Sequence, residues 1–99
     1  MLLFLHTATS PLCFTLSDGE KELYTHRVLR EESRAPFTNL CKSLATQMQS
    51  LNSTFNDIEK IFISLGPGSF TGIRLGLSFL KGVKLANAHI QFFGLPLIG

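Results

Sequence analysis

The feature that most constrains the fold is a short apolar run at 61–63 that lies between two segments with helical periodicity. The first segment begins at Pro36, a residue suited to the first turn of a helix, and its apolar residues recur three or four positions apart up to Leu51. The second runs from Gly72 to Ala88. A short run that is apolar throughout predicts a strand buried on both faces, as in a parallel sheet, and the two helices then act as crossover connections.

Three further short runs precede the first helical segment, at 2–5, 13–16 and 23–29. Turn residues lie between the second and third runs, with Gly19 able to take a positive φ, so these runs predict an antiparallel meander. A last apolar run at 91–93 completes the order strand-strand-strand-helix-strand-helix-strand. The order predicts an α/β fold with a mixed sheet, which by analogy is the ribonuclease H-like, actin-like ATPase type of lobe.

Charge is scarce and unevenly distributed. Charged residues make up 16% of the chain, below the usual quarter, which suggests that part of the surface is covered by something else. Residues 1–59 hold all seven acids and five bases, whereas residues 60–99 hold four bases and no acid. The basic part faces either solvent or an acidic partner or phosphate, but a net charge of +2 is too small to imply nucleic-acid binding.

Several classes of protein are disfavoured by what the sequence lacks. The apolar start is too short for a signal peptide, and no stretch approaches the roughly 20 apolar residues of a membrane span. Cys13 and Cys41 lie in dissimilar contexts, as expected of reduced thiols in the cytoplasm. His6, His26 and His89 lack the spacing of a zinc site. We therefore expect a cytoplasmic protein with no membrane segment, metal or cofactor.

The second helical segment is apolar around well over half of its circumference, which is wider than packing on one sheet requires. Small residues lie four positions apart at Gly72 and Gly76, and again at Gly82 and Ala86. Glycine within a helix costs about 0.5–1 kcal/mol relative to alanine, so this spacing suggests a close backbone approach, either to the chain's own sheet or to a partner.

A glycine-rich loop connects the predicted strand at 61–63 to this helix. Free backbone N–H groups at such a place can hold an anion, but the phosphate-binding loops do not match, because no lysine follows the glycines and Thr71 stands where a dinucleotide fingerprint needs glycine. Two interpretations stay open, an anion site and a tight turn capped by Ser69 or Thr71. The loop residues are Gly66, Pro67, Gly68, Ser69, Phe70, Thr71 and Gly72.

The eleven residues from Gly66 to Gly76, including Arg74, resemble the signature of the TsaB (YeaZ) family. The segments at 3–9 and 92–95 are similar to the family's opening strand and to the strand that leads to its second lobe. The resemblance implies that residues 1–99 are the N-terminal lobe of an actin-like, two-lobed protein whose second lobe is absent from this chain.

The resemblance also implies a function. Proteins of this family are non-catalytic scaffold subunits of the bacterial system that makes threonylcarbamoyladenosine at position 37 of tRNA. They bind the catalytic subunit TsaD through first-lobe helices, meet the ATPase TsaE within the complex, form homodimers when alone, and contact tRNA only indirectly. The wide apolar stripe agrees with such a role, and the pattern leaves open which edge of each helix faces the partner. The expected interface residues are Leu44, Met48, Ile73, Gly76, Leu77 and Leu80.

The alternatives are the nucleotide-binding lobe of an ASKHA-type kinase and a glycopeptidase relative. His6 stands where the family has aspartate, which removes a hard oxygen ligand for a nucleotide-bound metal. Ser69 does not lie in a G-x-S-x-G motif, and no zinc-ligand motif is present, so we expect no catalytic residue.

Overall fold

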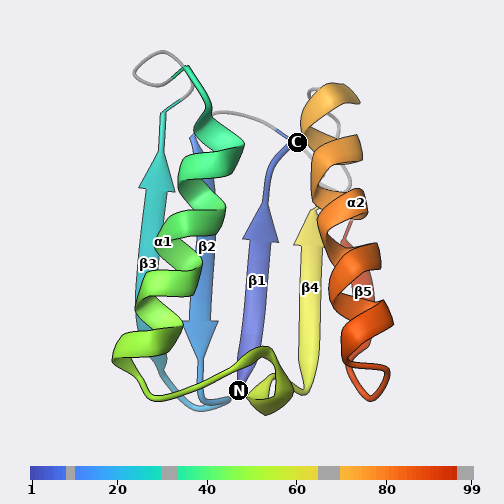
Figure 1. Cartoon of the computed structure of the whole chain (residues 1–99). Coiled ribbons are helices and arrows are strands. Elements are labelled where there is room, and N and C mark those ends of the chain that lie inside the picture. The colour runs from blue at the N-terminus through green and yellow to red at the C-terminus, as the bar shows by residue number, and fades with distance from the viewer. Residues whose placement is uncertain (9–10, 30–33, 65–69, 96–99) are drawn as a thin grey trace.

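The structure is a computed structural model that describes residues 1–8, 11–29, 34–64 and 70–95. A single five-stranded sheet forms its base, with the strand order β3-β2-β1-β4-β5 (Figure 1). The strands β1, β2 and β3 pair antiparallel, whereas β1, β4 and β5 pair parallel. This confirms the predicted meander followed by parallel strands. The strands are β1 (Leu2–His6), β2 (Leu12–Ser17), β3 (Glu22–Val28), β4 (Lys60–Ser64) and β5 (Gln91–Leu95).

The turn of the meander has the chemistry that its sequence predicts. Gly19 takes a φ of 102°, in the left-handed region that favours glycine, and its N–H donates to Ser17 Oγ over 3.0 Å. Asp18 Oδ1 accepts hydrogen bonds from the backbone N–H groups of Glu20 and Lys21, each 2.9 Å long. These two bonds hold the pKa of the Asp18 carboxyl below its usual value.

Both helices lie on one face of the sheet, α1 in front of β3 and β2 and α2 in front of β4 and β5 (Figure 1). Helix α1 spans Pro36–Ser50 and α2 spans Phe70–Ala86, with a short 3-10 turn, η2 (Phe55–Asp57), between α1 and β4. The chain therefore runs from β3 through α1 to β4, and from β4 through α2 to β5. Helix α2 begins and ends two residues earlier than predicted, because apolar periodicity does not mark helix ends.

The ends of α1 follow from its local sequence. Pro36 stands in the first turn, where its missing N–H costs nothing. At the other end Asn52 takes a φ of 55°, and its N–H donates to the carbonyl oxygen of Gln49 over 3.0 Å. The N–H of Ser53 donates to the carbonyl oxygen of Met48 over 2.9 Å. This pair of bonds is a Schellman motif, which closes the helix at the predicted place.

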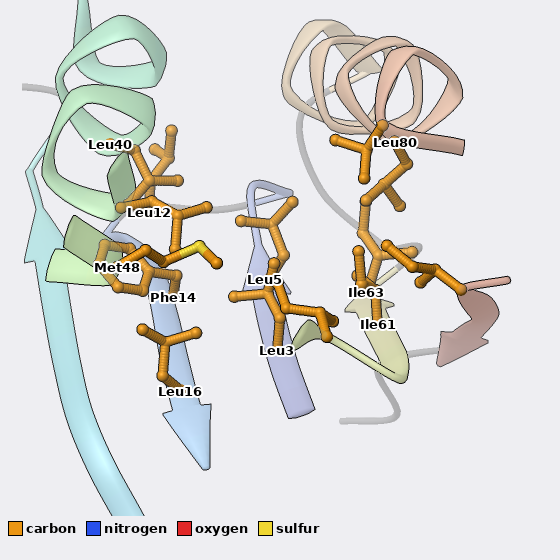
Figure 2. Close-up of a cluster of buried hydrophobic side chains, with 14 of the residues drawn as sticks. Leu3, Leu5, Leu12, Phe14, Leu16, Leu40, Met48, Ile61, Ile63 and Leu80 are labelled. Carbon is orange, nitrogen blue, oxygen red and sulfur yellow. The ribbon is translucent and has the colours of Figure 1, made fainter. Parts of the chain in front are cut away.

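The hydrophobic core fills the layer between the sheet and the helices, as Figure 2 shows. Alternate residues of each strand point toward the helices, because strand side chains alternate between the two faces. Side chains from β1 and β4 in the middle of the sheet connect the parts under α1 and under α2 into one core. Its members include Leu3, Leu5, Leu12, Phe14, Leu16, Leu40, Leu44, Met48, Ile61, Ile63 and Leu80.

The other face of the sheet carries a row of aromatic rings and, among the described residues, no helix. Phe4, Phe62 and Phe93 come from adjacent strands, and their ring centroids are 4.8 Å and 5.2 Å apart in stacked arrangements. Phe4 is 38% exposed and Phe93 40%, and Phe62 between them is half-buried. The prediction that the run at 61–63 is buried on both faces is therefore correct for the helix-covered face and wrong for the side of Phe62.

Candidate docking surface on the second helix

Helix α2 packs closely on its own sheet along one line of residues. Leu80 is 4% exposed, and Gly76 is also buried. A Cβ atom added at Gly76 would lie 2.7 Å from Thr7 Oγ1 and 2.8 Å from Ile63 Cδ1, so the helix reaches this position only because glycine has no side chain. The structure corrects the assignment of Gly76 and Leu80 to a partner interface, because both are packed within the chain itself.

Helix α1 requires the same correction. Leu44 is 1% exposed and Met48 3%, and both point into the core with Leu40. The apolar stripe of α1 is narrow enough for the sheet to cover it, and residues such as Lys42 and Thr46 on its outer side are exposed and polar. Leu44 and Met48 thus stabilise the fold, and neither side chain is available to a partner in this conformation.

Several apolar side chains on the remaining sides of α2 stay accessible. Leu75 is 42% exposed, Leu77 45% and Leu85 82%, and Ile73 is half-buried. Of the six residues expected at the interface, Leu77 and Ile73 are therefore the ones that a partner can reach. Leu75 and Leu85 were not among the expected residues. The width of the apolar stripe predicts that part of α2 stays uncovered. It does not predict which leucines are exposed, because that depends on which residues of α2 contact the sheet.

A groove of about 420 Å³ lies between α2 and the edge strand β5. Apolar side chains supply most of its wall, and two lysines from α2 also line it. Gly94, which has no side chain, lies on the β5 side of the groove. The groove is lined by Ile63, Leu77, Leu80, Lys81, Lys84, Leu85, Phe92, Phe93 and Gly94.

The two lysines of the groove have different surroundings. Lys84 Nζ donates to the carbonyl oxygens of Ala88 and Ile90 over 2.9 Å and 2.7 Å, and it lies 5.5 Å from the ring centroid of Phe92. Lys84 therefore fastens the end of α2 to the start of β5. Lys81 is exposed, so it can supply positive charge to a molecule that enters the groove.

The glycine-rich loop is only partly described. Gly66, Pro67, Gly68 and Ser69 lie outside the described residues. Phe70, Thr71 and Gly72 belong to the first turn of α2, and Arg74 is exposed further along it. Whether the loop holds an anion or forms a capped turn stays a prediction.

His6, at the end of β1, contacts the neighbouring strand β4 through a hydrogen bond. Its Nδ1 atom lies 2.6 Å from Ser64 Oγ at the end of β4. Burial lowers the pKa of His6, which favours the neutral imidazole.

No three His, Cys, Asp or Glu side chains among residues 1–8, 11–29, 34–64 and 70–95 lie close enough together to hold a metal ion. In the same ranges, no helix combines the length and the apolar character that crossing a membrane requires.

Solved structures with a similar fold come from Pseudomonas aeruginosa. YeaZ matches 96% of this chain and 43% of its own length, with a TM-score of 0.80 and 21% sequence identity. A protein described as uncharacterized, with similarity to the peptidase YeaZ, matches 96% of this chain and 42% of its own length, with the same TM-score and identity. This chain thus spans less than half of the length of these neighbours. At this identity the match establishes the fold, and it confirms the predicted actin-like, ribonuclease H-like lobe.

Comparison of sequences gives one family match. No curated protein matches the chain. A sequence model of one family, described as "TsaD: tRNA N6-adenosine threonylcarbamoyltransferase", matches residues 30–95, which is two thirds of the chain and includes both helices. By that match, and with the YeaZ fold in support, the chain belongs to the TsaD family of tRNA N6-adenosine threonylcarbamoyltransferases.

Proposed function

We propose that this chain is a non-catalytic, TsaB-type scaffold subunit that binds a TsaD-type catalytic subunit in the modification of adenosine 37 of tRNA. The observation that carries the proposal is the accessible apolar surface of α2. Leu75, Leu77 and Leu85 are 42%, 45% and 82% exposed on a single helix of a chain that is poor in charged residues.

A partner that covers these leucines removes apolar area from water, which favours association. Fully burying one leucine side chain contributes about 1.5–3 kcal/mol to the free energy of association. These side chains are already partly buried, so each contributes less than that. Leu77 and Leu85 both line the groove beside β5, and Leu75 lies on the other flank of the helix, so α2 offers a partner apolar contacts on two flanks. Helix α1 offers no comparable surface, because its buried leucines and methionine already face the sheet.

The proposal assigns the other components by their place in the complex. A TsaE-type ATPase joins through the complex, tRNA is contacted indirectly, and a second copy of this chain occupies the surface when TsaD is absent. Residues 1–99 act as the N-terminal lobe of a two-lobed, actin-like protein in the cytoplasm. This part of the proposal is supported by family membership and by the shared fold.

Co-purification with a tagged TsaD-type subunit tests the proposal. Leu75→Glu and Leu77→Glu place a charge on the proposed surface, and Thr46→Glu places the same charge on an exposed polar position of α1. We expect both leucine variants to fold, as judged by circular dichroism, and to lose at least tenfold in retention on TsaD. The Thr46→Glu control should be retained like the parent chain.

Two outcomes would contradict the proposal. One is equal retention of the leucine variants and the control, which would place the interface elsewhere. The other is unfolding of Leu77→Glu, which would place Leu77 in the core. Calorimetric titration with Mg-ATP separates the scaffold from the kinase-type alternative, since a nucleotide-binding lobe should release measurable heat and a scaffold should release none.

A further inference from the structure

The two edges of the sheet are protected to different degrees. The edge strand β3 carries the exposed charges Glu22 and Arg27, and its pairing with β2 is irregular at Leu16 and Ser17. Charges and bulges of this kind discourage pairing with another strand. The edge strand β5, Gln91–Leu95, has the sequence Gln-Phe-Phe-Gly-Leu, with no charge and no proline. By the same criteria β5 is the open edge.

The register locates the open backbone groups on β5. The N–H of Gln91 donates to the carbonyl oxygen of Glu59 over 3.0 Å, so Gln91 directs its backbone toward β4. Successive residues of a parallel strand direct their backbone N–H and C=O groups to opposite sides. The backbone groups of Phe92 and Gly94 therefore point away from β4. Ile90 also points outward, but its N–H donates to the Asn87 carbonyl and its own carbonyl accepts from Lys84. The open stretch therefore runs from Phe92 to Gly94, within the described part of β5.

Side-chain sites lie on both sides of this open stretch. On the helix side, the groove of about 420 Å³ presents Leu77, Leu85 and Phe92 next to the edge. On the other side, the stack of Phe4, Phe62 and Phe93 advances by 4.8 Å and 5.2 Å per strand. Those steps match the spacing of about 4.8 Å between neighbouring strands. An aromatic side chain on an added strand would thus continue the stack, while its neighbours in sequence would enter the groove.

Charge identifies the occupant. Residues 60–99 contain four bases and no acid, and Lys81 is exposed at the groove. A second copy of this chain, paired through its own β5, would offer the sequence Gln-Phe-Phe-Gly-Leu, which has no acid to meet Lys81. A segment with acidic residues meets an attractive field instead.

We propose that the β5 edge binds an extended acidic segment of a partner protein as a sixth strand. The segment places apolar side chains in the groove, an aromatic side chain beside Phe93, and acids near Lys81. Main-chain hydrogen bonds to Phe92 and Gly94 provide affinity, and the two side-chain sites provide specificity. The groove shares Leu77 and Leu85 with the surface proposed for the TsaD-type subunit, whereas the backbone edge of β5 is used by the segment alone.

A labelled peptide of sequence Asp-Glu-Val-Phe-Val-Glu-Asp tests the proposal with the whole chain. We expect saturable binding by fluorescence anisotropy and slower hydrogen exchange at the amides of Phe92 and Gly94, with β3 amides unchanged. N-methylation of the peptide at alternate residues gives two isomers, each with one blocked edge. One isomer should bind at least tenfold more weakly than the other, and a peptide with lysines in place of its acids should bind weakest.

A variant of the protein gives an independent measurement. Gly94→Pro removes an outward N–H and leaves the hydrogen bonds to β4 intact, a substitution that edge strands accept. We expect at least tenfold weaker binding of the peptide and unchanged retention on a TsaD-type subunit. Leu75 does not line the groove, so Leu75→Glu should lose TsaD retention and keep peptide binding, and the two proposals therefore fail separately.

Three results would overturn the proposal. The first is no peptide binding up to millimolar concentration. The second is equal binding of the two N-methylated isomers, which would show that the backbone edge is not used. The third is protection of the Phe92 and Gly94 amides that rises with protein concentration without peptide, which would make a second copy the occupant.

Discussion

The two halves of this sheet share one architecture and differ in how completely the chain covers them. In the first half, α1 turns its apolar stripe onto β2 and β3, and the edge strand carries charge and an irregular register. In the second half, α2 keeps three leucines accessible, and the edge strand is uncharged and apolar. All seven acids belong to residues 1–59, which leaves the second half purely basic. The contrast indicates that the second half is the side suited to association.

The largest expected effect compares one leucine from each helix. Leu44 is 1% exposed on α1 and Leu75 is 42% exposed on α2. Leu44→Ala should lower the free energy of unfolding by about 2–5 kcal/mol, because it removes buried methyl groups and leaves a cavity. Leu75→Ala should change it by less than about 0.5 kcal/mol. Urea unfolding followed by circular dichroism measures both, and similar losses in the two variants would refute the contrast between the halves.

The next effect compares two glycines of the same helix. Gly76→Ala introduces a Cβ 2.7 Å from the buried Thr7 Oγ1, whereas nothing lies within 4 Å of a Cβ at Gly82. Overpacking at Gly76 should lower the free energy of unfolding by about 1–3 kcal/mol. The higher helix propensity of alanine offsets about 0.5–1 kcal/mol of this loss.

At Gly82 only the propensity gain applies, so Gly82→Ala should stabilise the chain by about 0.5–1 kcal/mol. Thermal unfolding of both variants provides the measurement. If Gly76→Ala proved as stable as Gly82→Ala, α2 would not be held against the sheet as closely as the coordinates indicate.

The order of elements could be predicted from sequence because each element carries its own periodic signal. The helical repeat after Pro36, the alternation before Val28 and the turn at Gly19 each lead to a single local structure, and the structure agrees with all three. The observed ends of helices and strands differ from the predicted ends by one or two residues. Periodicity does not reveal the hydrogen bonds that end an element, such as those of Asn52 and Ser53.

The candidate site was harder to predict, because it depends on which apolar side chains the rest of the chain buries, and the sequence shows only which side chains are apolar. A helical wheel gives Leu80 and Leu77 the same weight, yet one is 4% exposed and the other 45%. Gly76 decides between them by allowing the helix to rest on Thr7 and Ile63. The open face beside Phe62 could not be predicted either, since a strand covered on one face and a strand covered on both look alike over three residues.

The smallest expected effect concerns the junction between the halves, where His6 of β1 meets Ser64 of β4. Burial lowers the pKa of His6 below its ordinary value of 6.5, so the unfolded chain binds a proton at this residue more readily than the folded chain does. Stability from this residue is therefore complete above pH 6.5 and decreases as the pH falls from 6.5 toward the lower pKa of the folded state. Urea midpoints measured between pH 5 and 8 should show this decrease in the parent chain, and His6→Gln should reduce the slope below about pH 6.5, the usual pKa of histidine. An identical pH profile in the variant would mean that the proton taken up on unfolding belongs to another group and that this junction is indifferent to pH.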